Sequence, residues 1–378
     1  MSRIGLLAPV RRYEDSFASL SEPFMHASGG NLGNFAFTEA LWRHCSPDVK
    51  IMTWDVSPAE ARESCDVLVF AAANQLGAHI DLGDFASHLE RIGLPLIAVG
   101  LGAQADRIDA PVALTPGTQR FARVLASLSP TGAPNIGVRG EFTLSVLDRL
   151  GVADHAVVTG CPSNFLNESA DLYSTLERRV AKAQIDRLCV AAGSRHFDAS
   201  KAAEPRLAQL VEATCGAYVV QADLDMVRFA RGESERIDAE ERQAIGRFIA
   251  PGLSEAELAR WRLRHAMCFT DATSWMEAMR NFDFVVGARF HGVMLAIQAG
   301  TPGGVIAHDS RTAEMCQTMA IPMQQGRDMP RDFHLDDLRR LFPFDVAKFA
   351  ATRERLRLSY VELLRGCGIE PTARLTAA

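Results

Sequence analysis

Long apolar runs are absent from the sequence. No stretch approaches the about 18 consecutive apolar residues that a membrane-spanning helix needs. The first residues, MSRIGLLAPVRRYEDSF, hold an apolar run too short for the core of a signal peptide, and they soon become charged. We therefore expect no transmembrane segment and no cleaved leader, and we leave contact with a membrane surface open.

An excess of positive charge is also absent. The 378 residues include 40 Lys and Arg against 46 Asp and Glu, which gives a formal net charge of -6 at pH 7. Proteins that bind nucleic acid along their surface carry the opposite balance. The composition therefore argues against nucleic acid as a partner, although a local site for a small anion is compatible with it.

Cysteine pairs and metal-ligand motifs are missing as well. The eight cysteines form no CxxC pair and lack the density of a disulfide scaffold; they are residues 45, 65, 161, 189, 215, 268, 316 and 367. We expect reduced, mostly buried thiols in a cytoplasmic protein. HExxH and acidic metal clusters do not occur either, so we expect no metal ion and no bound cofactor.

The sequence does contain a regular alternation of short apolar runs with helical patterns, which is typical of parallel α/β sheets. Its 378 residues are enough for two domains. Strands are predicted at 4–8, 49–54, 66–72, 95–100, 136–139 and 155–160, and then at 187–193, 217–222, 282–287 and 303–308. We predict two doubly wound α/β domains with mostly parallel sheets, over residues 1–165 and 166–343, that face one another across a cleft.

Two segments fall outside this alternation. Residues 231–266 are charged and helix-prone, with a break at Pro251-Gly252, and we interpret them as a helical insertion on the surface of the second domain. Residues 344–378 contain a terminal helix with one apolar stripe, formed by Val346, Phe349, Leu356, Tyr360 and Leu363. We expect this helix to pack back across the two domains.

The segment with the clearest chemistry is VVGARFHGVMLAIQAGTPGG, which begins at Val285. Arg289 and His291 lie between a buried strand and a helix that ends at Gly300. Free backbone N–H groups and the helix dipole make such a junction an anion site, and an Arg fork adds bidentate recognition of carboxylate or phosphate. His291 would act as a general acid, since a bound anion favours protonated imidazole. In the alternative, Arg289 pairs with an acid such as Asp283 and His291 caps the helix.

Further candidates lie in loops at predicted strand ends. SGGNLGN (28–34) offers glycines for the close approach of a ligand and the amides of Asn31 and Asn34, or it is a plain turn with an Asn helix cap. GLGAQA (100–105) matches GxGxx[GA], but no clear helix follows, and we interpret it as a cleft loop that presents Gln104. AAGSRHF (191–197) places Arg195 at a strand end, facing either the cleft or solvent. Cys161, in TGCPSN, is interpreted as a structural thiol.

In their order along the chain, these segments resemble the polysaccharide pyruvyl transferases. That family has a strand ending in Gly, then Arg-Leu-His-Gly, a helix, and a Gly-x-Pro turn before a strand that ends with an acidic and a basic residue. The matching positions here are Gly287, Arg289-Phe290-His291-Gly292, Gly300-Thr301-Pro302, Asp309 and Arg311. GGNLGN and GVRGEFTLSVLDRLGV (137–152) resemble two earlier segments of the family, while Cys161 stands where the family has Asp.

The resemblance implies a fold like that of the GT-B glycosyltransferases, with two Rossmann-like domains and an active site in the cleft between them. It also implies a reaction: transfer of the enolpyruvyl group of phosphoenolpyruvate to a sugar, closing a ketal without a metal. The acceptor would be a glycan or a glycan precursor, either lipid-linked or nucleotide-activated.

Roles for single residues also follow from the resemblance. His291 and Arg289 would be catalytic. The second domain would bind the donor through Arg195, Gly287, Gly292 and Arg311, and the first domain would bind the acceptor near Gly30, Asn31, Asn34, Asn74 and Gln104.

Two other functions are compatible with the same fold. A GT-B glycosyltransferase would use a nucleotide-sugar and bind a nucleoside diphosphate in the second domain, usually through an acidic residue on the ribose. A non-catalytic binding or scaffold protein would keep the fold without the chemistry, and the presence of both Arg289 and His291 argues against it. The oligomeric state is not predicted.

Overall fold

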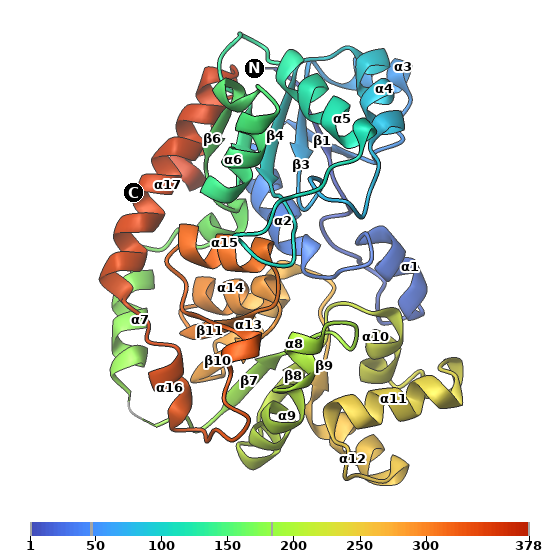
Figure 1. Ribbon diagram of the computed structural model, residues 1–378, viewed down its shortest axis with the longest axis vertical. Helices are drawn as coiled ribbons and strands as arrows, with labels where there is room; N and C mark the ends of the chain where they lie inside the picture. Colours follow the sequence, from blue (N-terminus) through green and yellow to red (C-terminus); the bar gives the residue numbers. More distant parts are fainter. Residues whose placement is uncertain (1, 46–47, 183, 377–378) are drawn as a thin grey trace.

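The protein is built on two parallel six-stranded sheets (Figure 1). The computed structural model describes residues 2–45, 48–182 and 184–376. Residue 1 of the predicted first domain and residues 377–378 of the predicted terminal segment therefore lie outside the described residues. The first sheet has the order β2-β1-β3-β4-β5-β6 and contains Ile4–Leu7, Val49–Met52, Val67–Ala71, Leu96–Leu101, Ile136–Val138 and Ala156–Val158 as β1 to β6. The second has the order β12-β11-β10-β7-β8-β9 and contains Leu188–Ala191, Ala217–Val219, Ala266–Met267, Phe284–Gly287, Gly303–Ala307 and Met323–Gln325 as β7 to β12.

The central strands are apolar throughout because helices cover both of their faces. Every residue of β3, β4, β7, β10 and β11 is buried, as expected for strands inside a doubly wound parallel sheet. All pairings between the named strands are parallel. The predicted α/β class with two parallel sheets is thus confirmed. The edge strands β9 and β12 were not predicted, since each has at most three residues and no apolar pattern of its own.

Helices fill the connections between the strands. Those of the first half are α1 to α6, at Ser21–Ala27, Asn34–Cys45, Pro58–Ser64, Gly83–Ile92, Pro116–Ser127 and Glu141–Arg149. Those of the second half are α7 to α16, at Leu172–Ala181, Asp198–Lys201, Glu204–Ala213, Leu224–Arg231, Ala239–Ile249, Glu255–His265, Ala272–Met279, Phe290–Gln298, Ser310–Thr318 and Asp337–Leu341. The chain closes with α17, Val346–Gly366, and α18, Ala373–Thr376. None of the described helices is long and apolar enough to cross a bilayer.

Each sheet has one point where the strand order reverses direction. In the first sheet it lies between β1 and β3, and in the second between β7 and β10. The loops that leave neighbouring strands at such a point turn to opposite faces of the sheet and open a crevice at the carboxyl edge. The two reversal points therefore fix where each half of the protein can bind a ligand.

The segment after β1 crosses to the second half of the protein. Tyr13 donates its backbone N–H to the Thr270 carbonyl at 3.0 Å, and the Ser21 hydroxyl donates to Glu233 at 2.9 Å. Helix α1 lies beside α10 of the second half, as Figure 1 shows. Part of the segment 9–33, which precedes residue 165, therefore packs against helices and loops of the second half.

The charged segment 231–266 is more than a surface insertion. Helices α11 and α12 bury one face each, through Ile245, Phe248, Ile249, Leu258 and Trp261. The chain then enters β9, which pairs with β8. The segment is therefore the connection that delivers an edge strand, and its charges mark only the outer faces of two amphipathic helices.

The final long helix lies along both halves of the protein. Helix α17 contacts β5 and β6 of the first sheet and α7 of the second half, and it runs down the side of the molecule in Figure 1. Its buried Arg353 donates to the carbonyls of Asn164 and Asn167 at 2.7 and 2.6 Å. These carbonyls belong to the chain segment that links the two sheets, so the helix braces the link between them.

Candidate functional site

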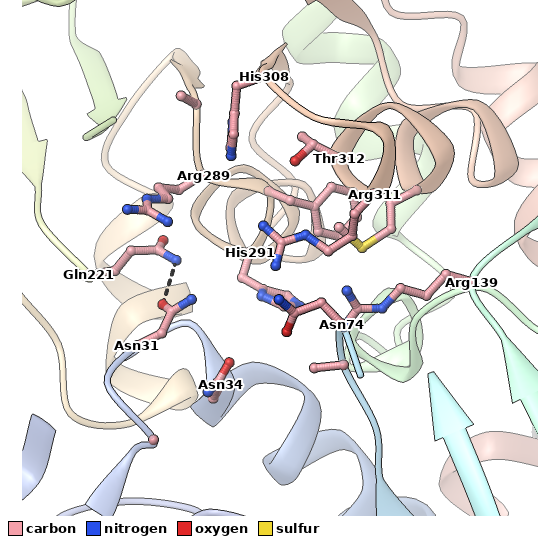
Figure 2. Close-up of a pocket in the computed structure, with 15 residues that line it drawn as sticks. Asn31, Asn34, Asn74, Arg139, Gln221, Arg289, His291, His308, Arg311 and Thr312 are labelled. Atoms are coloured by element: carbon pink, nitrogen blue, oxygen red, sulfur yellow. Dashed lines mark hydrogen bonds between the residues drawn. The ribbon is translucent and has the colours of Figure 1, made fainter. Parts of the chain in front are cut away.

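One cavity of about 200 Å³ lies where the two reversal points meet (Figure 2). From the first half it is lined by Gly29, Asn31, Asn34, Ala73, Asn74 and Arg139, and from the second half by Gln221, Ala288, Arg289, Phe290, His291, His308, Arg311, Thr312 and Met315. Nearly all of these residues follow the carboxyl end of a strand or begin the next helix. Parallel strands thus bring loops from distant parts of the sequence to one point.

Arg289 and His291 reach the cavity from the turn between β10 and α14. Arg289 precedes the first residue of α14, and His291 lies in the first turn of that helix. This turn packs tightly on β7: a Cβ at Gly287 would lie 2.0 Å from the Ala191 carbonyl oxygen, and a Cβ at Gly292 would lie 2.8 Å from the Ala191 Cβ. Gly287 and Gly292 do not line the cavity; they let β10 and α14 approach β7, which places Arg289 and His291.

Arg139 is a cavity residue that the sequence reasoning missed. It follows the three-residue strand β5 and is only 2% exposed. No described acidic group lies within ion-pair distance of it, and its Nε has no hydrogen-bond partner among the described residues. Burial lowers the pKa of Arg139 to about 10, which still leaves it charged at neutral pH. A buried, unpaired guanidinium is costly in a free protein and calls for an anionic ligand.

Arg311 and His308 enter from the turn after β11. Asp309 caps α15 by accepting a hydrogen bond from the Thr312 N–H at 2.8 Å, and its second oxygen lies 3.4 Å from the Arg311 guanidinium. Both ring nitrogens of His308 are buried without a described hydrogen-bond partner, although Nε2 lies 3.7 Å from the second oxygen of Asp309. Burial lowers the pKa of His308 to about 4, so its ring is neutral at physiological pH.

The cavity is an anion site by its charges. Three guanidinium groups, from Arg139, Arg289 and Arg311, reach it, and no carboxylate is among the residues that line it. Burial lowers the pKa of Arg289 to about 10, with a further contribution from Arg311. Arg289 has no described ion pair within 4 Å, and Asp283 pairs instead with Lys182 at 2.8 Å. The alternative in which Arg289 pairs with Asp283 is therefore wrong.

His291 lies between the guanidinium groups. In Figure 2, Arg139, Arg311 and Asn74 lie on one side of its ring, and Arg289 and Gln221 lie on the other. Burial, Arg139 and Arg311 together lower the pKa of His291 to about 3. The imidazole is thus neutral in the free protein, and any role as an acid needs a source of the proton.

The wall of the cavity opposite α14 is made of amides. Gln221 donates to the Asn31 side-chain oxygen at 3.0 Å, joining the two halves of the protein, and the Leu32 N–H donates to the Gln221 carbonyl at 2.7 Å. A Cβ at Gly33 would lie 2.4 Å from the Gln221 amide and 3.1 Å from the His291 Cβ. Asn34 donates to the Ser28 carbonyl at 2.9 Å, which shapes the loop before α2.

Residues 31–310 match the polysaccharide pyruvyl transferase family, which is a family of transferases. The chain belongs to this family. The matched segment contains the lining residues from Asn31 to His308, while Gly29, Arg311, Thr312 and Met315 lie outside it. No curated protein sequence gives a significant match.

Solved structures with a similar course of the chain bind nucleotides. One is the S. aureus MnaA bound to UDP, with a TM-score of 0.49, 10% identity, and coverage of 98% of this chain and 99% of that one. Another is a UDP-glucose: anthocyanidin 3-O-glucosyltransferase in complex with UDP (TM-score 0.40, 11% identity, coverage 100% and 99%). A third is UGT2 of Phytolacca americana with UDP-2fluoro-glucose and pterostilbene (TM-score 0.36, 10% identity, coverage 96% and 95%).

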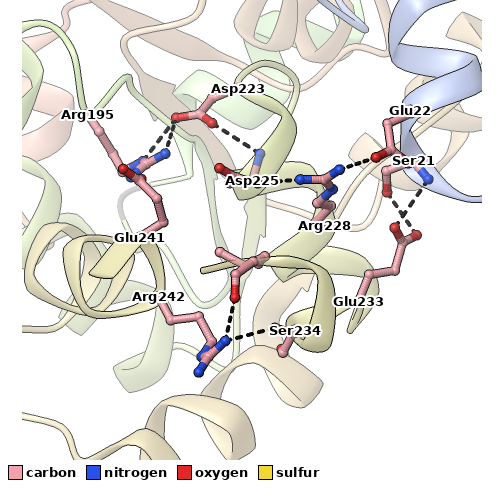
Figure 3. Close-up of polar contacts among 11 residues, drawn as sticks. Ser21, Glu22, Arg195, Asp223, Asp225, Arg228, Glu233, Ser234, Glu241 and Arg242 are labelled. Carbon is pink, nitrogen blue, oxygen red and sulfur yellow. Dashed lines mark hydrogen bonds and ion pairs between the residues drawn. The ribbon is translucent and has the colours of Figure 1, made fainter. Parts of the chain in front are cut away.

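Arg195 is not brought into the cavity. Its guanidinium forms an ion pair with Asp223 at 2.8 Å and another with Glu241, as Figure 3 shows. Asp223 begins α10 and Glu241 lies in α11, so neither partner is near Arg195 in the sequence. With both partners in place, Arg195 anchors α10 and α11 beside the site and has no free face for the donor.

Two residues predicted on the acceptor side lie outside the cavity. Gln104 accepts a hydrogen bond from the Asn74 amide at 2.6 Å and therefore supports Asn74 from behind. Gly30 has a φ of +77°, and nothing lies within 4 Å of the position of a Cβ there. Its glycine is needed for the backbone turn that brings Asn31 to the cavity, since a left-handed conformation disfavours other residues.

A buried carboxyl group joins the two halves beside Arg139. Glu314 of α15 accepts hydrogen bonds from the Thr143 N–H at 2.6 Å and the Thr143 hydroxyl at 2.8 Å. Burial raises the pKa of Glu314 to about 7. The folded protein therefore binds this proton more tightly than the unfolded chain does, and the contribution to stability is lost as the pH rises from about 4.5 through 7.

We expect a Glu314→Gln variant to show a smaller fall in the free energy of unfolding between pH 5.5 and pH 8 than the wild type, by on the order of 2 kcal/mol. Buried Glu204, whose pKa is also raised to about 7, keeps part of the dependence in both proteins. Chemical denaturation at the two pH values measures the difference. Glu362→Gln, at an exposed position of α17, is the matched control and should show the same pH dependence of stability as the wild type. Equal pH dependence in Glu314→Gln and the wild type would contradict the assignment.

Proposed function

We propose that the protein transfers the enolpyruvyl group of phosphoenolpyruvate to a saccharide and closes it into a ketal. The observation that carries this proposal is the cavity itself, with three guanidinium groups around one imidazole and no lining carboxylate. Phosphoenolpyruvate carries its carboxylate and its phosphate on one carbon, and the methylene carbon that must be protonated is joined to that same carbon. The family supports the transfer of a pyruvyl group to a glycan.

The arrangement around His291 fits a donor with two anionic ends. Arg139 and Arg311 provide one cationic side of the cavity and Arg289 provides the other, with His291 between them (Figure 2). Guanidinium groups recognise phosphate and carboxylate through paired hydrogen bonds. A donor held by both anionic groups would have its methylene carbon as the third substituent between them, free to face the imidazole, and proton transfer needs that orientation.

The chemistry then runs in three steps. His291 gives a proton to the methylene carbon of phosphoenolpyruvate, and positive charge develops at the neighbouring carbon, which bears the phosphate oxygen. A sugar hydroxyl attacks that carbon. Phosphate leaves, and a second hydroxyl closes the ring and gives its proton to the departing phosphate. Arg139, Arg289 and Arg311 stabilise the anionic phosphate as it departs, because a buried cation acts without screening by water.

The acceptor would bind against the amide wall. Asn31, Asn34 and Asn74 offer donors and acceptors of the kind that sugar hydroxyl groups use. A glycan precursor, lipid-linked or nucleotide-activated, fits such a wall. We place the reaction in the cytoplasm, where all eight cysteines would stay reduced, consistent with their being free thiols.

Thermal unfolding tests the donor directly. At a concentration 100 times its Kd, phosphoenolpyruvate is expected to stabilise the folded protein by about 2.7 kcal/mol, and added salt should weaken the effect. UDP is the comparison ligand, because a glycosyltransferase would bind it while the cavity here offers no carboxylate for a ribose. Stabilisation by UDP without any by phosphoenolpyruvate would favour the glycosyltransferase. Stabilisation by phosphoenolpyruvate without turnover of any saccharide would favour a binding protein.

A further inference from the structure

Next to His291, and not among the residues that line the cavity, lies a buried thiol. The Cys161 Sγ lies 3.6 Å from the His291 Nε2 and 3.1 Å from the Ser163 hydroxyl oxygen. Cys161 and Ser163 have no exposed surface, and both come from the turn that follows β6. A continuous row of Ser163, Cys161 and His291 therefore runs from the core to the cavity.

The charged groups that act on His291 are cations. Arg139 and Arg311 face His291 from the turn after β5 and from α15. On the other sides lie Tyr360 of α17, Met319 after α15, whose sulfur accepts the Cys161 N–H, and the ring of Phe37 from α2. No described carboxylate lies within 4 Å of His291. The Cys161 thiol is therefore the described polar group within hydrogen-bond distance of the His291 imidazole.

We propose that Cys161 is a positioning residue for His291: its S–H donates to Nε2, which keeps the ring proton on Nδ1, and it supplies a proton to Nε2 during turnover. Only the supply of a proton during turnover rests on the proposed function; the position of the ring proton does not. A thiol is a weak hydrogen-bond donor, and its proton can pass to a nitrogen that accepts this hydrogen bond.

The proton balance explains how a neutral imidazole can act as an acid. As Nδ1 gives its proton to the methylene carbon of phosphoenolpyruvate, the thiol proton moves to Nε2. The S–H and Nδ1–H bonds break, a C–H and an Nε2–H bond form, and sulfur keeps the electron pair beside the Arg139 guanidinium. The proton released from the attacking sugar hydroxyl restores the thiol through the same ring. The imidazole therefore never carries a full positive charge among the guanidinium groups, where its pKa is about 3.

Nitrogen NMR of labelled histidine tests the positioning half without any substrate. With His291→Asn to assign the signal, the wild type is expected to hold the proton on Nδ1, Cys161→Ser to keep that form, and Cys161→Ala to shift toward a mixture of the two forms. Cys65→Ala, which removes another buried thiol that does not line the cavity, should match the wild type. A wild-type ring with its proton on Nε2, or no difference between Cys161→Ala and the wild type, would overturn the proposal.

Steady-state kinetics with phosphoenolpyruvate and an accepted saccharide tests the supply of the proton. Cys161→Ser and Cys161→Ala should both lower kcat by about 10- to 100-fold, with KM for phosphoenolpyruvate little changed, because neither side chain touches the donor. Melting temperatures identify loss of folding separately. Wild-type kcat in both variants would overturn the relay. If the wild type turns over no saccharide, the proposed function fails, while the NMR result still decides where the His291 proton lies.

Discussion

A His291→Asn variant is expected to lose catalytic activity and still to bind phosphoenolpyruvate. Removing the group that protonates the reacting carbon should lower kcat by about 10²- to 10⁴-fold. Because the imidazole is neutral in the free protein and the charge of the cavity comes from the arginines, the affinity for phosphoenolpyruvate should change only a few-fold. Release of phosphate measures kcat, and calorimetric titration with phosphoenolpyruvate measures the affinity.

The two readouts separate the roles that His291 could have. Loss of binding together with loss of turnover would make His291 a ligand of the anion. Unchanged turnover would remove it from the chemistry. Asn is the suitable replacement because it keeps a polar side chain at a buried position whose neighbours, Gly33 and Phe37, lie close to it.

An Arg139→Met variant is expected to bind phosphoenolpyruvate far more weakly and yet to be more stable without it. Removing one partner of a buried charged contact costs about 2–5 kcal/mol of binding, which is roughly 30- to 5,000-fold in Kd. In the free protein, however, Arg139 is buried without a described ion pair. Methionine fills similar space without a buried charge, so the melting temperature of the free protein should rise.

Arg353→Met is the matched control for Arg139→Met. Arg353 is also a buried arginine, but it donates to two backbone carbonyls and to the Tyr173 hydroxyl. Its removal should lower the melting temperature and leave phosphoenolpyruvate binding largely intact. If Arg139→Met instead lowers the stability of the free protein, Arg139 is a structural residue. If it leaves the Kd unchanged, the cavity does not bind the anion through it.

The strands and the β10–α14 junction could be predicted because local sequence determines them. A run such as FDFVVG is apolar enough to form a buried strand without reference to the rest of the chain, and the Arg-x-His that follows must lie at the carboxyl edge. Arg139 could not be found in this way. Its strand has three residues, and a single Arg before a helix is common on protein surfaces.

Arg195 shows the opposite error. It does follow a strand of the second sheet, as predicted. However, its guanidinium forms ion pairs with Asp223, at the start of α10, and with Glu241 of α11, instead of reaching the cavity. Asp223 and Glu241 are distant in sequence, and nothing local indicates that their helices close over the strand end. For the same reason, the sequence does not predict that residues 9–33 contact the second half. These contacts depend on residues far apart in the chain, such as Ser21 and Glu233.

The central claim is that this cavity joins phosphoenolpyruvate to a sugar. Incubation of the wild-type protein with phosphoenolpyruvate and a panel of saccharides, followed by phosphate assay and mass spectrometry of the sugars, tests it most directly. We predict release of phosphate in step with the appearance of one pyruvyl ketal per acceptor, both absent in His291→Asn. Phosphate release without any modified sugar, or transfer of a glycosyl group from a UDP-sugar in its place, would contradict the claim.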